Sequence, residues 1–185
     1  MVVFISGTGS NLEAVLKAIE SGRLSRARVE AVIADCDAPG LDFARARSIP
    51  THVANLADFD SRDEWNGALA DVTARYAPRL VVLAGFMRLL GTPMLEAFAG
   101  RIINTHPALL PSFPGAHGVR DAMAHGVKIT GASVIYVDAG VDTGAIIDQR
   151  AVRIEDTDTE ETLHERIKTE ERDMLIDVID SLSRA

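Results

Sequence analysis

Short apolar runs alternate with amphipathic segments along the whole chain, and this alternation constrains the fold more than any other feature. The run Val2–Ile5 is followed by a segment from Leu12 to Ile19 whose apolar residues recur at the i, i+3, i+4 and i+7 spacing of one helix face. The early runs are uniformly apolar, as in parallel strands that are buried on both faces. The pattern predicts an α/β fold with a doubly wound, mostly parallel sheet.

Turn-forming residues between the runs set the bounds of the predicted strands. The last two strands are close in sequence, which predicts an antiparallel hairpin at one edge of the sheet. Strands are expected at residues 2–5, 29–34, 51–53, 80–84, 101–105, 130–137 and 146–154.

The helix starts carry their own signals. Ser61 with Glu64, and Thr157 with Glu160, have the spacing of capping boxes. Pro93 suits the first turn of a further helix. Helices are expected between the glycine turn at residues 7–9 and Gly22, at 41–48, at 61–76, after Pro93, and from 157 to about 182.

Length and composition favour one globular domain that spans residues 1–185. The prior for a single domain is ~150 residues, and the 47% apolar and 25% charged residues are typical of a globular chain. No internal repeat or linker interrupts the pattern. The first residues lack the basic region of a signal peptide, and no apolar run approaches the ~18 residues of a membrane span.

Charge and cysteine content limit the partners and the compartment. The net charge of −8 provides no general basic field, so nucleic acid is not the expected partner. A single cysteine, Cys36, excludes a disulfide framework and favours a reducing, cytoplasmic location. We expect no membrane association.

The glycine turn after the first strand is a candidate anion site. It reads Ser-Gly-Thr-Gly-Ser-Asn from Ser6 to Asn11 and opens a helix, whose N-terminal N–H groups suit a phosphate. Leu12 stands where a dinucleotide fingerprint has its third glycine, and no P-loop lysine follows. The alternative is a tight turn in which Ser10 or Asn11 caps the helix and no ligand binds.

The strand predicted at residues 101–105 contains Asn104 near its end, and His106 follows it directly. The two lie two residues apart and therefore point to the same side. Three prolines stiffen the loop after His106. An amide and an imidazole side by side form a plausible oxyanion site. The alternative is a structural histidine that bonds a loop carbonyl.

Two further segments leave their roles open on the residues alone. Asp142 lies in a glycine-containing loop and would stabilise an imidazolium if it reached His106, although a solvated turn aspartate is the commoner case. Residues 87–90 are either core or the wall of an apolar pocket. The chain has no zinc-type motif and no nucleophile elbow, so no metal is predicted.

Four segments together resemble the folate-dependent formyltransferase family, and the resemblance covers essentially the whole chain. They are SGTGSNL at 6–12, LAGFMR at 83–88, INTHPALLP at 103–111 and VDTG at 141–144. The resemblance implies a Rossmann-like formyltransferase fold. It also implies transfer of a formyl group from 10-formyltetrahydrofolate to the amine of glycinamide ribonucleotide, in de novo purine biosynthesis. The alternative at the same site is a 10-formyltetrahydrofolate hydrolase.

The resemblance also assigns roles to particular residues. The catalytic residues are Asn104, His106 and Asp142; the ribonucleotide contacts are Gly9, Ser10, Asn11, Lys168 and Glu171; the folate contacts are Arg62, Met87, Arg88, Leu89, Leu90, Asn104, Asp138, Ala139, Gly140, Val141 and Asp142. With these contacts, residues 87–90 become a pocket wall rather than core. The folate is a co-substrate, and no metal is required.

Three departures from the family pattern bear on these expectations. Val119 replaces a second histidine after His117, and Ala145 replaces a proline in the folate loop. The chain ends at Ala185, before most family members do. The oligomeric state is left open as monomer or homodimer. An alternative function of a different class is a non-catalytic module that binds a phosphosugar. Such a module would not need Asn104, His106 and Asp142 together.

Overall fold

A computed structural model describes residues 1–184, which form two compact units. Unit 1 is Met1–Asn104, and unit 2 begins at Thr105. The two are described separately below. No helix in residues 1–184 is both long enough and apolar enough to cross a membrane.

Unit 1 is built on parallel strands in the order β3-β2-β1-β4-β5. Pairing runs in register from Val2 beside Ala31 and Val81 to Leu83 beside Asn104. Because the order reverses at β1, the carboxyl ends of β1 and β4 flank the switch point where α/β sheets bind ligands. The strands are β1 (Val2–Ile5), β2 (Ala31–Ala34), β3 (Thr51–Val53), β4 (Val81–Leu83) and β5 (Ile102–His106), of which β1, β2 and β4 are wholly buried.

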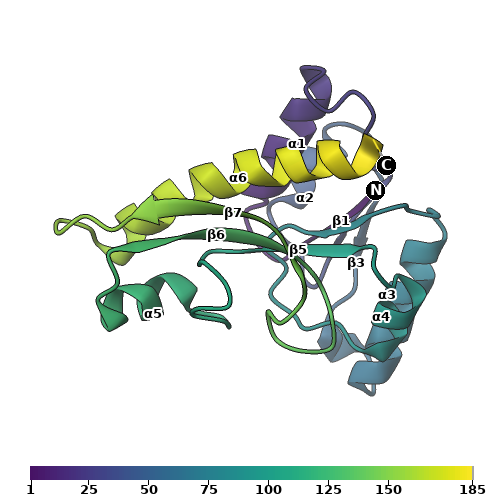
Figure 1. The fold of residues 1–185 in the computed structure, drawn as a ribbon. Helices are drawn as coiled ribbons and strands as arrows, with labels where there is room; N and C mark the ends of the chain where they lie inside the picture. The colour runs from purple at the N-terminus through teal and green to yellow at the C-terminus, as the bar shows by residue number, and fades with distance from the viewer. Residues whose placement is uncertain (185) are drawn as a thin grey trace. The chain divides into compact units, whose positions relative to one another are not determined.

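The helices of unit 1 follow its strands, and α3 and α4 pack side by side (Figure 1). Trp65 anchors α3: its ring stacks on Phe86, which in turn meets Phe4 of β1 edge-on, and its Nε1 donates to the Ala54 carbonyl. The helices are α1 (Ser10–Glu20), α2 (Leu41–Arg45), η1 (Leu56–Asp58), α3 (Arg62–Ala74) and α4 (Thr92–Ala97).

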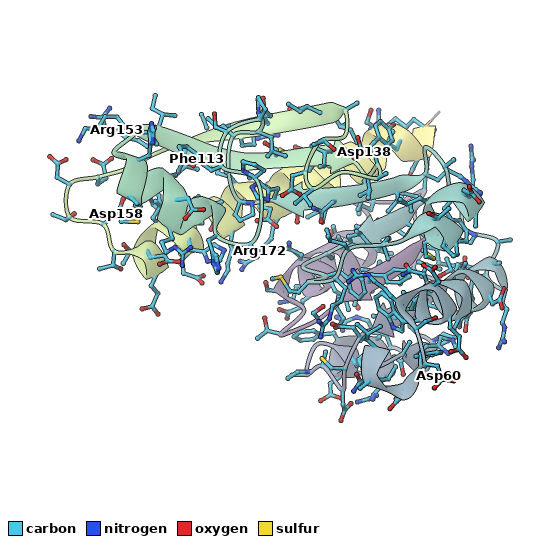
Figure 2. All side chains as sticks on the ribbon, turned by 90° about the horizontal axis from the view of Figure 1, so that it is seen from below. Asp60, Phe113, Asp138, Arg153, Asp158 and Arg172 are labelled. Atoms are coloured by element: carbon cyan, nitrogen blue, oxygen red, sulfur yellow. The ribbon has the colours of Figure 1, made fainter. Side chains whose placement is uncertain are left out.

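Unit 2 contains an antiparallel hairpin covered by a long helix. Strand β6 (Ile129–Tyr136) pairs with β7 (Ile146–Arg153), and α6 (Glu160–Arg184) runs along them (Figure 1). A shorter helix, α5 (Gly118–His125), precedes the hairpin. Arg166 stabilises the start of α6 because it donates to the Arg153 carbonyl and to both oxygens of Asp158. Arg153 and Asp158 lie at the same end of unit 2 (Figure 2).

The predicted fold class is confirmed, with all seven strands present and the last two antiparallel. The strand predicted at 29–34 begins at Ala31. The helix predicted at 41–48 ends earlier, at Arg45, and the chain then turns through Ser48, which has positive φ, before Pro50. The prediction of a strand end at residue 105 was short by one, so that His106 is itself part of β5. Helix α5 and the turn η1 were not predicted.

One capping box was half right and the other was wrong. Ser61 accepts a hydrogen bond from the Glu64 N–H as expected, but the Glu64 carboxylate accepts from Asp60 rather than from Ser61. At the last helix, Thr159 accepts from the Thr162 N–H, so the cap lies two residues after Thr157. The prediction that residues 1–185 form one domain stays a prediction.

Candidate functional site

The glycine turn lies in unit 1, at the carboxyl end of β1. Gly9 precedes α1 in the left-handed conformation, with φ 72°. A Cβ on Gly9 would lie 2.7 Å from the Gly40 Cα, so this position requires glycine, whereas a Cβ on Gly7 would meet no atom within 4 Å. The turn is thus a close backbone-to-backbone contact between the loops after β1 and β2.

No side chain caps α1, which contradicts the alternative that Ser10 or Asn11 does so. Gly9 occupies the cap position instead, and its carbonyl accepts from the Glu13 N–H. The first N–H groups of α1, at the positive end of the helix dipole, therefore have no side chain that accepts their hydrogen bonds. A phosphate is the natural acceptor for such groups.

The predicted folate residues of unit 1 come together after β4. Arg62 Nη2 donates to the Leu89 carbonyl over 2.7 Å, which ties the start of α3 to residues 87–90. Met87 is 78% exposed and Leu89 is 56% exposed, so neither is core. An exposed apolar pair held in place by an arginine is suited to an amphipathic ligand.

His106 is the central side chain of unit 2 and is 4% exposed at the end of β5. Its Nε2 lies 2.8 Å from the Phe113 carbonyl oxygen, and its Nδ1 lies 3.4 Å from Asp142 Oδ2. A carbonyl can only accept a hydrogen bond, so Nε2 carries a proton and donates it to Phe113. The ring therefore bonds a loop carbonyl, as the structural alternative expected, and it also faces Asp142. Its catalytic role stays a prediction.

The loop after His106 is shaped to hold the ring. Phe113 has φ 57°, an unusual backbone conformation for a bulky residue, and this conformation accompanies the bond from His106 to its carbonyl. A Cβ on Gly118 would lie 3.0 Å from His106 Nε2 and 3.1 Å from the Phe113 oxygen. A side chain at Gly118 would therefore displace the His106 ring or the start of α5 by a few tenths of an ångström.

Asp142 is fixed by its own backbone and by Gly115. It has φ 55°, which aspartate tolerates better than most residues, and its Oδ2 accepts from the Gly115 N–H over 2.8 Å. The loop before it is closed by Asp138, whose Oδ1 accepts from Thr143 Oγ1 and from the Gly140 N–H. The same carboxylate oxygen of Asp142 therefore faces both Gly115 and His106.

Sequence reasoning missed the residues that hold the loop from behind. Ser133, buried on β6, donates to the Ala108 carbonyl over 2.7 Å and accepts from the Leu110 N–H over 3.0 Å. Gln149 on β7 donates to the Leu110 carbonyl and to Ser133 Oγ. The only signal for this network was one serine inside an otherwise apolar strand.

The remaining predicted ribonucleotide contacts of unit 2 lie on α6. Glu171 Oε1 accepts from Thr105 Oγ1, and Thr105 points to the face of β5 opposite to His106 because side chains alternate along a strand. Lys168 Nζ pairs with Glu165 at 2.7 Å. The structure therefore places Glu171 on the other face of β5 from His106.

Comparison with known proteins identifies the family. The sequence model of the formyl transferase family matches residues 1–179. The chain belongs to the formyl transferase family. Phosphoribosylglycinamide formyltransferase of Mycobacterium tuberculosis (strain ATCC 25618 / H37Rv) is 51% identical over 183 residues, which are 99% of this chain and 84% of the relative. The Bacillus subtilis (strain 168) enzyme of that name is 39% identical over 168 residues, 89% of this chain and 85% of the relative.

A solved structure agrees with this assignment. Glycinamide ribonucleotide transformylase 1 from Symbiobacterium toebii matches this formyltransferase with a TM-score of 0.96 and 44% identity, over 99% of this chain and 86% of the solved one. The doubly wound formyltransferase fold predicted from the sequence is thereby confirmed. Among residues 1–184, no group of three or more histidine, cysteine or acidic side chains is placed to hold a metal ion.

Proposed function

We propose that this formyltransferase moves the formyl group of 10-formyltetrahydrofolate to the amine of glycinamide ribonucleotide, a step of de novo purine biosynthesis. The observation that supports this proposal best is the buried His106, whose Nδ1 faces Asp142. The chain that holds this pair is 51% identical to a protein named for this reaction. The folate is a co-substrate, and its formyl group is the cargo of the reaction.

The proposed chemistry uses side chains at the end of β5. The amine nitrogen attacks the formyl carbon, a carbon–nitrogen bond forms, and negative charge develops on the formyl oxygen. Asn104, two residues before His106 on the same strand, donates an amide N–H to that oxygen, and the positive charge of a protonated His106 ring stabilises it electrostatically. An imidazolium has donors on both nitrogens, and Phe113 and Asp142 supply the two acceptors.

Completion of the reaction requires one proton transfer. The bond from the formyl carbon to N10 of the folate breaks as the attacking amine loses a proton, and N10 gains one. We propose that the His106–Asp142 pair carries this proton, directly or through water, because Asp142 faces the ring and orients it. The balance is one amine proton lost and one folate N–H formed.

The other predicted residues have proposed binding roles. Gly9, Ser10 and Asn11 would bind the ribonucleotide phosphate at the uncapped start of α1, and Lys168 and Glu171 would contact the ribonucleotide. Arg62, Met87, Leu89 and Leu90 would bind the folate, supported by the exposed Met87 and Leu89. Residues 138–142 would border the folate, as predicted. The cytoplasmic location, the absence of nucleic-acid and membrane partners, and the state as monomer or homodimer remain predictions from the sequence.

The test follows release of folate from 10-formyltetrahydrofolate with and without glycinamide ribonucleotide. Release that requires the ribonucleotide, and that falls by roughly 10²–10³ in Asn104→Ala, is the expected result. Release without the ribonucleotide would make this chain a hydrolase. Turnover of Asn104→Ala within a few-fold of wild type would remove the assigned oxyanion donor.

A further inference from the structure

Arg88 was predicted to contact the folate, and in unit 1 its guanidinium pairs with Asp35. Arg88 Nε donates to Asp35 Oδ2 over 2.9 Å. Asp35 directly follows β2, which ends at Ala34, and Arg88 comes after β4, which ends at Leu83. The order β2-β1-β4 places two strand spacings of ~4.8 Å between these two ends. The arginine side chain therefore extends across the carboxyl end of β1.

The carboxyl end of β1 is the point where the glycine turn begins. Ser6, the first residue of that turn, accepts the Met87 N–H on its Oγ over 2.8 Å and donates its own N–H to the Gly85 carbonyl. Cys36, next to Asp35, donates its thiol to the Ser6 carbonyl over 3.3 Å. These contacts hold the segments that carry Arg88 and Asp35 on either side of the turn.

The Arg88–Asp35 pair is not arranged as a simple stabilising contact. Asp35 is 5% exposed, and its second oxygen, Oδ1, is buried and accepts no hydrogen bond within residues 1–184. A buried carboxylate with an unsatisfied oxygen is costly, so stability alone does not explain it. Arg88 is 48% exposed and uses only Nε for Asp35, which leaves both Nη groups to donate to a ligand.

We propose that Arg88 binds the phosphate of the ribonucleotide at the glycine turn and that Asp35 is the residue that positions it. This inference rests on the proposed function. Arginine suits the task because Nε can donate to Asp35 while the two Nη groups donate to phosphate oxygens. Lysine, with a single ammonium group, cannot hold the buried acid and reach the ligand in the same way.

The test compares affinity for ribose 5-phosphate, by calorimetry, with the KM values of the two substrates. We expect Arg88→Met and Arg88→Lys to weaken ribose 5-phosphate by about 10-fold or more, the usual effect of losing a charged hydrogen bond. The KM for glycinamide ribonucleotide should rise in parallel, while the KM for 10-formyltetrahydrofolate stays unchanged. Asp35→Asn should give a smaller rise in the ribonucleotide KM, because its amide oxygen can still accept from Nε.

Asp37→Asn is the matched control, since Asp37 lies two residues further along the same loop and is exposed. It removes the same charge and should leave all three values unchanged. A separate readout reports on Asp35: burial, followed by the charge of the neighbouring Asp35, raises the pKa of the Cys36 thiol. Alkylation of Cys36, the only cysteine, should therefore be faster in Asp35→Asn than in wild type.

Three results would overturn the inference. A rise in the folate KM with unchanged ribose 5-phosphate affinity would show that Arg88 contacts the folate instead. Wild-type affinity in Arg88→Lys would show that Asp35 does not position the side chain at residue 88. An equal rise in the KM values of both substrates would show that the Arg88–Asp35 pair has only a structural role. Failure of the proposed function looks different, because ribose 5-phosphate would still bind in an Arg88-dependent way while no ribonucleotide-dependent transfer occurred.

Discussion

The two candidate regions of this formyltransferase are built by opposite means. The glycine turn of unit 1 is shaped by backbone, since Gly9 packs on Gly40 and no side chain caps α1. The His106 region of unit 2 is shaped by side-chain hydrogen bonds and by two non-glycine residues, Phe113 and Asp142, with positive φ. A backbone site of N–H groups suits a ligand whose charge does not change, and a side-chain site suits a proton that must move.

This difference predicts that changes in unit 2 reduce kcat and changes at the glycine turn raise the KM of the ribonucleotide. The largest effect is expected for Asp142→Asn. The amide oxygen can still accept from Gly115, but the charge facing His106 is lost, so kcat should fall by roughly 10²–10⁴-fold. Steady-state kinetics checks this, with the exposed Asp156→Asn as the charge control. A loss confined to KM would contradict the comparison.

Gly9→Ala should have the next largest effect, and it should fall on binding. The new Cβ would lie 2.7 Å from the Gly40 Cα at a residue with φ 72°, so the turn must shift away from the phosphate. A left-handed residue other than glycine costs ~1–2 kcal/mol, which corresponds to about 10-fold in the ribonucleotide KM. Gly7→Ala is the control, because its Cβ would meet nothing within 4 Å. Similar KM values for the two variants would refute the role assigned to Gly9.

Gly118→Ala should act on His106 without removing any catalytic group. Its Cβ would lie 3.0 Å from His106 Nε2, so the ring or the start of α5 must move by a few tenths of an ångström. We expect kcat to fall by up to about 10-fold, since catalysis is sensitive to small displacements. Gly67→Ala, inside α3 with open space around it, should raise stability by ~0.5–1 kcal/mol and leave kcat unchanged. An unchanged kcat in Gly118→Ala would show that the ring tolerates the contact.

Asp158→Asn should affect stability alone and should have the smallest effect on activity. Hydrogen bonds from Arg166, followed by the Glu155 N–H, hold the pKa of Asp158 well below its ordinary value. Because the folded-state pKa is the lower one, this contribution to stability is complete above the ordinary value of ~3.9 and is lost as the pH falls toward the folded-state pKa. The variant should lower Tm at pH 7, and the difference should shrink at pH 3. A Tm difference that does not depend on pH would contradict the ionic origin.

The sequence contained enough information for the sheet, and it named candidate site residues whose roles stay predictions. Uniform apolar runs located β1, β2 and β4, because burial on both faces leaves no polar positions there. Asn104 and His106 stood out because polar residues at a strand end carry the chemistry of α/β folds. Asp142 was singled out only by the resemblance to the family, since a solvated turn aspartate is the commoner case. The alternative in which Ser10 or Asn11 caps α1 is contradicted: both are good capping residues, and only the close contact with Gly40 shows why Gly9 takes that position.

Long-range pairs were beyond local patterns. The bond from Arg88 to Asp35 spans 53 residues, and the bond from Gln149 to Leu110 spans 39. No spacing rule links such positions, because tertiary packing alone brings them together. Helix α5 was missed because it is short, follows a loop with three prolines, and has no capping side chain that would indicate where it begins.

The most direct test of this account measures formylated ribonucleotide formed from 10-formyltetrahydrofolate by wild type and by His106→Ala, alongside the affinity of each for ribose 5-phosphate. The account predicts product that depends on glycinamide ribonucleotide, loss of product by about 10²-fold or more in His106→Ala, and unchanged affinity for ribose 5-phosphate. Product formation by His106→Ala close to the wild-type rate would contradict the central role of the His106–Asp142 pair.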